Sequence, residues 1–242
     1  MSYPQGRYQS DRPQGQYGYS PYGTVAAGDT RDRFLVRTYN HLFGAILLFA
    51  GIEIALFKTG IADRIVGALA GNWLIAIMLF MLVGWGATHA AHRAMSKAAQ
   101  YAALAGFVAM QAIMFVPLLW MANRFAPGAI QSAGLVTILG FGALTGIVFW
   151  TRKDFSFLGA FLRWAFIAAA LVIVASLIFG FSLGVLFSVA MVGLAGAAIL
   201  YDTSNVLHHY PEDRYVGAAL ELFSSVALLF WYVLRLFMSS RD

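Results

Sequence analysis

The chain has 242 residues, of which 60% are hydrophobic and 11% are charged, and its mean hydropathy is +0.72. A soluble globular domain carries roughly 25% charged residues, so this composition excludes a water-soluble fold and predicts a multi-pass membrane protein. The absence of cysteine excludes disulfides, thiolate metal sites and a cysteine nucleophile. The net charge of +5 does not indicate nucleic-acid binding, because the Lys and Arg residues lie mostly at the ends of apolar segments.

The first 30 residues are rich in Pro, Gln, Gly and Tyr and contain no long apolar segment. They therefore lack the apolar core of a cleavable signal peptide. This composition also buries too little apolar surface to offset the entropy lost on ordering. The sequence predicts that residues 1–30 form a disordered cytosolic tail and that residues 31–242 form the membrane domain.

Seven apolar segments are each close to the length of about twenty residues that a helix needs to cross the ~30 Å hydrocarbon core. They cover residues 39–57, 72–89, 98–121, 130–150, 158–179, 183–202 and 216–237. The predicted fold class is an all-α integral membrane protein with seven transmembrane helices. Only Gly180, Phe181 and Ser182 separate the fifth and sixth segments, which predicts a tight helical hairpin.

The distribution of positive charge predicts the orientation of these helices. Eleven of the 16 Lys and Arg residues fall on the side of the membrane that holds the N-terminus. Cytoplasmic loops retain positive residues, so the N-terminus is predicted to be cytoplasmic and, after seven crossings, the C-terminus lies outside. This topology places Asp202 at the cytoplasmic mouth of the sixth segment.

Three acidic residues lie within the predicted spans: Glu53 in the first, Asp202 at the end of the sixth and Glu221 early in the seventh. A charged residue at mid-membrane costs about 2.5–3.5 kcal/mol on insertion scales, so each of the three is a candidate site residue. Asp202 would otherwise end its helix at the interface, and Glu221 would pair with Arg214 or with headgroups. Glu53 would pair with Arg124 or hydrogen-bond a neighbouring helix.

Glu221 and Ser225 are four residues apart and share one face of the last predicted helix. This helix starts on the side of the membrane where the preceding helix ends, so its face is expected to converge with Asp202. An ionised acid pair at this position would bind a cation. A pair that shares a proton would act as a pH-responsive latch.

The sequence contains two histidine pairs that could in principle bind a metal. His89 and His92 have a spacing that permits metal binding on one helix face, but no acid or cysteine completes a ligand set, and no metal site is predicted. The adjacent His208 and His209 point in different directions, so we expect them to respond to headgroups or local pH rather than to bind a metal.

Two activities are excluded by missing residues. Tyr201 and Asp202 resemble one half of an intramembrane aspartyl protease site, but the GxGD motif that would supply the second carboxylate is absent. A retinal protein needs a lysine in its last helix, and the lysines of this chain are Lys58, Lys97 and Lys153. We therefore expect no enzymatic activity and no cofactor.

A family resemblance rests on four segments of the chain. They are TYNHLF (38–43), TRKDFSFLGAFL (151–162), AAILYDTSNVLHHY (197–210) and ALELFSSVALLFWYVLRLF (219–237). Together they resemble the Bax inhibitor-1 family of seven-span membrane proteins, and most closely its YccA-like bacterial branch. The resemblance implies six helices wrapped around a central C-terminal seventh, a cytoplasmic N-terminus, and location among the lipids of the inner (plasma) membrane.

In the best-understood branch of this family, one aspartate in the sixth helix and one in the seventh form a pH-sensitive latch that controls a calcium leak. Asp202 matches the first aspartate, whereas Ser225 occupies the second position and Leu228 stands where an asparagine is common. A serine cannot share a proton as a carboxylate does, so the latch would need Glu221, one turn away. The resemblance thus implies a non-enzymatic leak or sensor for calcium or protons.

The TSN that follows Asp202 and the SSRD near the end of the chain are most similar to the YccA branch. That branch is associated with modulation of FtsH, a membrane-anchored ATP-dependent protease. By analogy, the resemblance implies a second function, a regulatory binding protein that engages an FtsH-type protease through residues 1–30. The two functions are compatible with each other.

Overall fold

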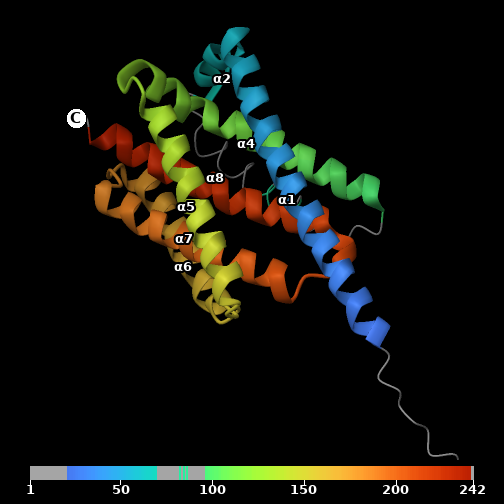
Figure 1. Cartoon of the computed structure of the whole chain (residues 1–242). Coiled ribbons are helices and arrows are strands. Elements are labelled where there is room, and N and C mark those ends of the chain that lie inside the picture. Colours follow the sequence, from blue (N-terminus) through green and yellow to red (C-terminus); the bar gives the residue numbers. More distant parts are fainter. Residues whose placement is uncertain (1–20, 70–81, 83, 85, 87–95, 241–242) are drawn as a thin grey trace, which may run out of the picture.

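The computed structural model describes residues 21–69, 82, 84, 86 and 96–240, and residues 21–29 by their backbone alone. The regular elements in this part of the chain are all helical (Figure 1). The six long helices are α1 (Pro21–Lys58), α4 (Lys97–Phe125), α5 (Ala129–Thr151), α6 (Leu158–Phe179), α7 (Val185–His208) and α8 (Tyr215–Ser239). A short helix α2 (Ile61–Leu69) follows α1, and a 3-10 turn η1 (Glu212–Arg214) precedes α8.

Six of the described helices are long and apolar enough to cross a membrane, and they match six of the seven predicted segments. The other predicted span, residues 72–89, lies outside the described residues except at positions 82, 84 and 86. Helix α6 has the predicted bounds. Helix α7 continues past Asp202 to His208, so Asp202 does not end its helix as the interfacial interpretation required.

Helix α1 begins ahead of the predicted domain boundary. It starts at Pro21, so residues 21–30, which were predicted to belong to a disordered tail, are helical. Proline is favoured in the first turn of a helix, because the N–H that it lacks would have no helical partner there. Residues 1–20 of the predicted tail lie outside the described residues.

Helix α8 occupies the centre of the described helices (Figure 1). It packs against α1, α4, α5 and α7, and most of its length is buried. Buried small residues at its start, Gly217, Ala218 and Ala219, allow neighbouring backbones to approach closely. Helix α6 differs from the predicted ring of helices around α8, because it packs mainly on α7 and only Gly159 and Leu162 of its residues are buried.

Aromatic side chains join α1, α4 and α8. The ring of Phe115 on α4 stacks on Phe230 of α8, with the ring centroids 5.6 Å apart. It also packs edge to face with Trp231 of α8 and with Phe49 of α1, with ring centroids 4.9 and 5.1 Å apart. Edge-to-face and offset arrangements of this kind are the favoured geometries of aromatic pairs, so one side chain holds three helices in register.

The predicted hairpin between α6 and α7 is present. The two helices pack on each other and are joined by residues 180–184, two more than the sequence suggested. Gly180 ends α6 with φ of 71°, a left-handed conformation that glycine adopts without steric cost.

Candidate functional site

Asp202 on α7 and Ser225 on α8 are in direct contact. The Ser225 hydroxyl donates a hydrogen bond of 2.5 Å to Oδ2 of Asp202. Ser225 is 7% exposed, and Asp202 is partly buried. The structure thus brings together two of the four predicted site residues. The short bond is typical of a hydroxyl that donates to an ionised carboxylate.

Glu221 lies one turn before Ser225 on α8, and its charge acts on Asp202. The Tyr210 hydroxyl, in the loop after α7, hydrogen-bonds the Glu221 carboxyl. Burial raises the pKa of Tyr210, and the charge and hydrogen bond of Glu221 raise it further, so the hydroxyl keeps its proton at neutral pH and donates it. We call Asp202, Tyr210, Glu221 and Ser225 the α7–α8 cluster.

The end of α7 is held by Arg31 of α1. Its guanidinium donates to three carbonyl oxygens, those of Val206 (2.7 Å), Leu207 (3.2 Å) and Tyr210 (2.6 Å). Carbonyls at a helix C-terminus lack helical partners and carry partial negative charge, so a cation is the favoured cap there. Thr30 adds a hydrogen bond of 3.1 Å to Glu212. Residues at the predicted start of the membrane domain therefore position the loop of the α7–α8 cluster.

The loop between α5 and α6 is tied to α7 through Asp154. The Ser204 hydroxyl donates to Oδ1 of Asp154 at 3.3 Å and accepts from the Phe155 N–H at 2.8 Å. The Ser156 N–H also donates to Oδ1 of Asp154 at 2.8 Å, and Nε2 of His209 lies 3.4 Å from Oδ2. The Ser156 backbone hydrogen bond holds the pKa of Asp154 below its usual range, and the charge of His209 lowers it further.

The first turn of α6, directly after this loop, also contacts α7. The ring of Tyr201 lies against Gly159, and a Cβ at that position would be 2.8 Å from the Cε2 atom of Tyr201. Real side chains do not approach so closely, so only glycine fits. The segments TRKDFSFLG and LYDTSN are therefore two sides of one contact. Both segments carry the family resemblance, but nothing in the sequence pattern indicated that they meet.

The whole membrane domain matches one family of sequences, the family described as "Inhibitor of apoptosis-promoting Bax1", over residues 31–242. The chain belongs to the Bax inhibitor-1 family. Its relatives include an uncharacterized protein of Pseudomonas aeruginosa, 37% identical over 109 residues, which are 45% of this chain and 49% of the relative.

Two other relatives come from a plant and a bacterium. Protein LIFEGUARD 4 of Arabidopsis thaliana is 35% identical over 116 residues, 45% of this chain and 46% of the relative. Modulator of FtsH protease YccA of Escherichia coli K12 is 32% identical over 108 residues, 44% of this chain and 49% of the relative. The chain spans about half the length of the curated relatives that it matches.

Glu53 does not belong to the α7–α8 cluster of this Bax inhibitor-1 family member. At 1.5 Å per residue it lies about 33 Å along α1 from Arg31. It is 7% exposed, and neither carboxylate oxygen has a hydrogen-bond partner among the described residues. The predicted pairing with Arg124 is wrong: the Arg124 guanidinium lies 3.8 Å from Oδ1 of Asp63 and 4.1 Å from the centre of the Trp120 ring.

The two described histidines near the site make local contacts at the end of α7 and with the loop between α5 and α6. His208 lies with Nδ1 at 3.0 Å from the Ser204 carbonyl oxygen, and His209 faces Asp154. His89 and His92 lie outside the described residues. Within the ranges that the structure describes, no three His, Cys, Asp or Glu side chains are grouped so as to hold a metal ion.

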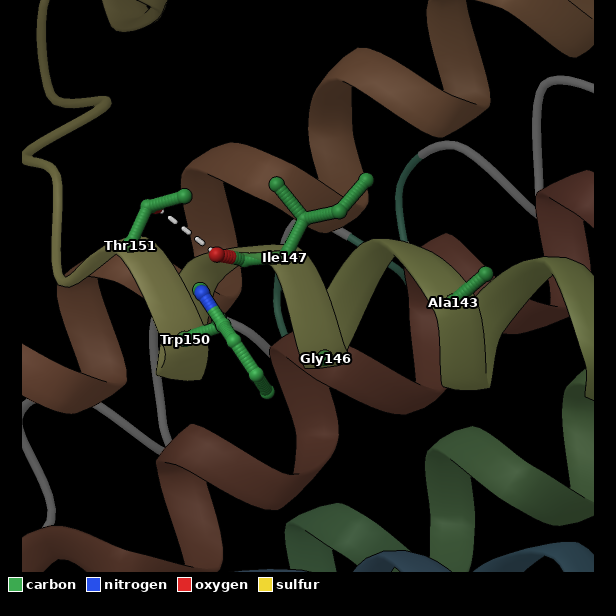
Figure 2. A pocket seen from close by; sticks show the side chains of 5 residues that line it. All are labelled: Ala143, Gly146, Ile147, Trp150 and Thr151. Atoms are coloured by element: carbon green, nitrogen blue, oxygen red, sulfur yellow. Dashed lines mark hydrogen bonds between the residues drawn. The ribbon is translucent and has the colours of Figure 1, made fainter.

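Among the described residues, two of the cavities lie on the helix surfaces. The first, about 370 Å³, is lined by residues of α5 alone: Ala143, Gly146, Ile147, Trp150 and Thr151 (Figure 2). The Thr151 hydroxyl in it donates to the Ile147 carbonyl at 2.7 Å, and the indole N–H of Trp150 is the other polar side-chain group in its lining. The second cavity, about 350 Å³, lies between α1 and α4. Neither lining includes a residue of the α7–α8 cluster.

Proposed function

We propose that this protein is a pH-sensitive leak or sensor for cations, either calcium or protons, in the inner (plasma) membrane, with its gate between α7 and α8. The observation that carries the proposal is the 2.5 Å hydrogen bond from Ser225 to Asp202, with the charge of Glu221 beside it. The position that carries an aspartate in the latch of the family holds a hydroxyl here, and it still contacts Asp202. Under this proposal the protein is not an enzyme.

The contact supplies a mechanism for closing the path. A hydroxyl that donates to an ionised carboxylate forms a hydrogen bond about twice as strong as one between neutral groups. An ionised Asp202 therefore holds α7 against α8. Protonation of Asp202 weakens this bond, so acidification loosens the contact and increases the leak. Glu221 supplies negative charge beside the opening, which attracts a cation.

Calcium flux into proteoliposomes tests this function. Asp202→Asn removes the ionisable group but keeps its size, so we expect a flux that no longer changes between neutral and acidic pH. Ser225→Ala removes the hydroxyl and adds no bulk, so we expect a raised flux at neutral pH. Unchanged flux and unchanged pH dependence in Asp202→Asn would overturn the proposal.

A second function is favoured by the relative named Modulator of FtsH protease YccA. We propose that the residues before α1 engage an FtsH-type membrane protease and that the helical core serves as the anchor. Arg31 and Thr30 bind the end of α7 and η1, so the deletion that isolates this role removes residues 1–20 and leaves these contacts in place.

The deletion variant and the full chain are compared in proteoliposomes that contain an FtsH-type protease and a fluorescent membrane substrate. We expect the full chain to change the rate of substrate degradation and the deletion variant to leave it unchanged. If both proteins changed the degradation rate equally, a role for residues 1–20 would be excluded.

A further inference from the structure

Five side chains from α1 and from the first turns of α4 and α8 lie close together. They are Arg37 and His41 of α1, Lys97 and Tyr101 of α4, and Tyr215 of α8. The Lys97 Nζ lies 4.4 Å from the centre of the Tyr215 ring, and the Arg37 Cζ lies 5.6 Å from the same centre. We call these five residues the interfacial cluster.

Hydrogen bonds fix the aromatic members of the interfacial cluster. Nδ1 of His41 lies 2.6 Å from the Arg37 carbonyl oxygen, and because a carbonyl only accepts, Nδ1 carries the proton. Nε2 of His41 lies 3.0 Å from the Tyr101 hydroxyl, which in turn lies 3.4 Å from the hydroxyl of Tyr215. The aromatic groups thus form a fixed frame for the two cations.

The two cations are not neutralised within the described part of the chain. Neither Arg37 nor Lys97 forms an ion pair with a described carboxylate, and both are exposed. Among the described residues, Lys97 Nζ donates one hydrogen bond to the backbone carbonyl of Asp213, and two of its three N–H donors are left for another partner. Two positive charges therefore lie close to one tyrosine ring, which favours an anion beside them.

The second cavity begins at this cluster. Its polar lining is Asn40, His41 and Tyr101, and its remaining lining is apolar: Gly44, Ala45, Leu48, Leu104 and Ala105. These residues continue the helical stripes that begin with the cations. On α1 the stripe runs from Arg37 through His41 to Leu48, and on α4 it runs from Lys97 through Tyr101 to Ala105. The groove is therefore cationic at one end and apolar along its length.

We propose that this groove binds one anionic phospholipid, with the phosphate between Arg37 and Lys97 and an acyl chain along the apolar stripes. Charge complementarity selects an anionic headgroup, since basic residues at a membrane surface each contribute to binding anionic lipids. The level of the site agrees with this occupant, because tyrosine side chains favour the boundary between headgroups and hydrocarbon. Leu48 and Ala105 lie deeper in predicted spans, where an acyl chain runs.

Native mass spectrometry of the full chain tests the proposal. The protein is equilibrated in detergent with equal amounts of phosphatidylglycerol and phosphatidylcholine, and the bound lipids are counted. We expect one retained phosphatidylglycerol. Lys97→Gln and Arg37→Gln should each lower the preference for phosphatidylglycerol about fivefold, the effect of one basic residue at a membrane surface. Lys153→Gln, which removes an exposed lysine in another loop, should leave the preference unchanged.

A second pair of variants tests the apolar part without changing charge. Gly44→Leu fills the groove, and Gly51→Leu adds the same side chain elsewhere on α1; a Cβ at either glycine meets no atom within 4 Å. Leucine is a better helix former than glycine, so both variants should fold. Gly44→Leu should abolish the retained lipid, and Gly51→Leu should not.

Three results would overturn the proposal. One is an equal preference for phosphatidylglycerol in Lys97→Gln, Arg37→Gln and Lys153→Gln. Another is an unchanged number of retained lipids in Gly44→Leu. The third is displacement of the lipid by inorganic phosphate together with insensitivity to Gly44→Leu, since this would identify a site for the free anion instead of a lipid.

Discussion

Nη2 of Arg31 lies 2.7 Å from the carbonyl oxygen of Val206, so the first helix caps the helix that carries Asp202. The same guanidinium stacks over Phe34, with its Cζ 4.8 Å from the ring centre. Because the cap lies one turn beyond Asp202, any movement of the end of α7 must first break these contacts. The position of α1 and the state of the α7–α8 cluster are therefore mechanically linked.

Replacing this arginine is expected to destabilise the protein. Arg31→Gln leaves carbonyl oxygens at the end of α7 without a charged donor, which should lower the free energy of unfolding by about 2 kcal/mol. Thermal unfolding in detergent measures the loss, and hydrogen exchange at residues 206–210 locates it. Arg33→Gln, an exposed arginine on the same helix, is the matched control. An equal loss in both variants would contradict the capping role.

The contact between Gly159 and Tyr201 makes a second prediction. Gly159→Ala places a Cβ 2.8 Å from the tyrosine ring, so overpacking should cost about 1–3 kcal/mol of stability. Gly142→Ala, in helix α5, meets no atom within 4 Å and should instead stabilise the protein slightly. Unfolding temperatures of the two variants on opposite sides of the wild type would fit this packing, whereas a neutral Gly159→Ala would not.

Acid should release the loop that Asp154 holds. The pKa of Asp154 is lowered in the folded protein, so its contribution to stability is complete above the unfolded value of about 3.9 and is lost as pH falls below it. The protection of residues 152–157 from hydrogen exchange, measured against the intrinsic rate at each pH, should therefore be strong at neutral pH and should give way to fast exchange relative to that rate in strong acid. Asp154→Asn should show the fast exchange at neutral pH already. Slow exchange in this variant would mean that the loop is held by other contacts.

A carboxylate at position 225 should change the pH response of the leak. Ser225→Asp places a second acid at the site of a 2.5 Å contact, and two acids at this distance share a proton. We expect calcium flux in proteoliposomes to vary more steeply with pH than in the wild type. Ser225→Asn, of similar size but without charge, is the control. Identical pH profiles of the two variants would exclude a proton-sharing pair.

The sequence predicted the helices better than it predicted their contacts. Apolar length locates a spanning helix, which is why residues 158–179 were predicted with the observed bounds. Apolar length does not locate the end of a helix that continues through polar residues whose side chains hydrogen-bond to neighbouring helices or loops. Asp202 and Ser204 made the end of α7 look like the start of a loop, but Ser225 and Asp154 satisfy them inside the fold.

The candidate site was predicted in part for the same reason. A four-residue spacing places Glu221 and Ser225 on one face of a helix, and topology brings that face to Asp202. The cap by Arg31 joins residues more than 170 positions apart, which no local pattern encodes. The predicted pairing of Glu53 with Arg124 failed because a local pattern does not show which carboxylate lies nearest in space. Asp63 on the short helix α2 provides a closer carboxylate for Arg124.

The central position of α8 has a consequence for biosynthesis. The helix that contacts α1, α4, α5 and α7 is the last of them to leave the ribosome. Until it inserts, the faces that it will cover must be shielded by lipid, by the insertion machinery or by temporary contacts among the earlier helices. The ribosome therefore delivers α8 after the four helices that pack on it, and assembly of this core has to wait for α8.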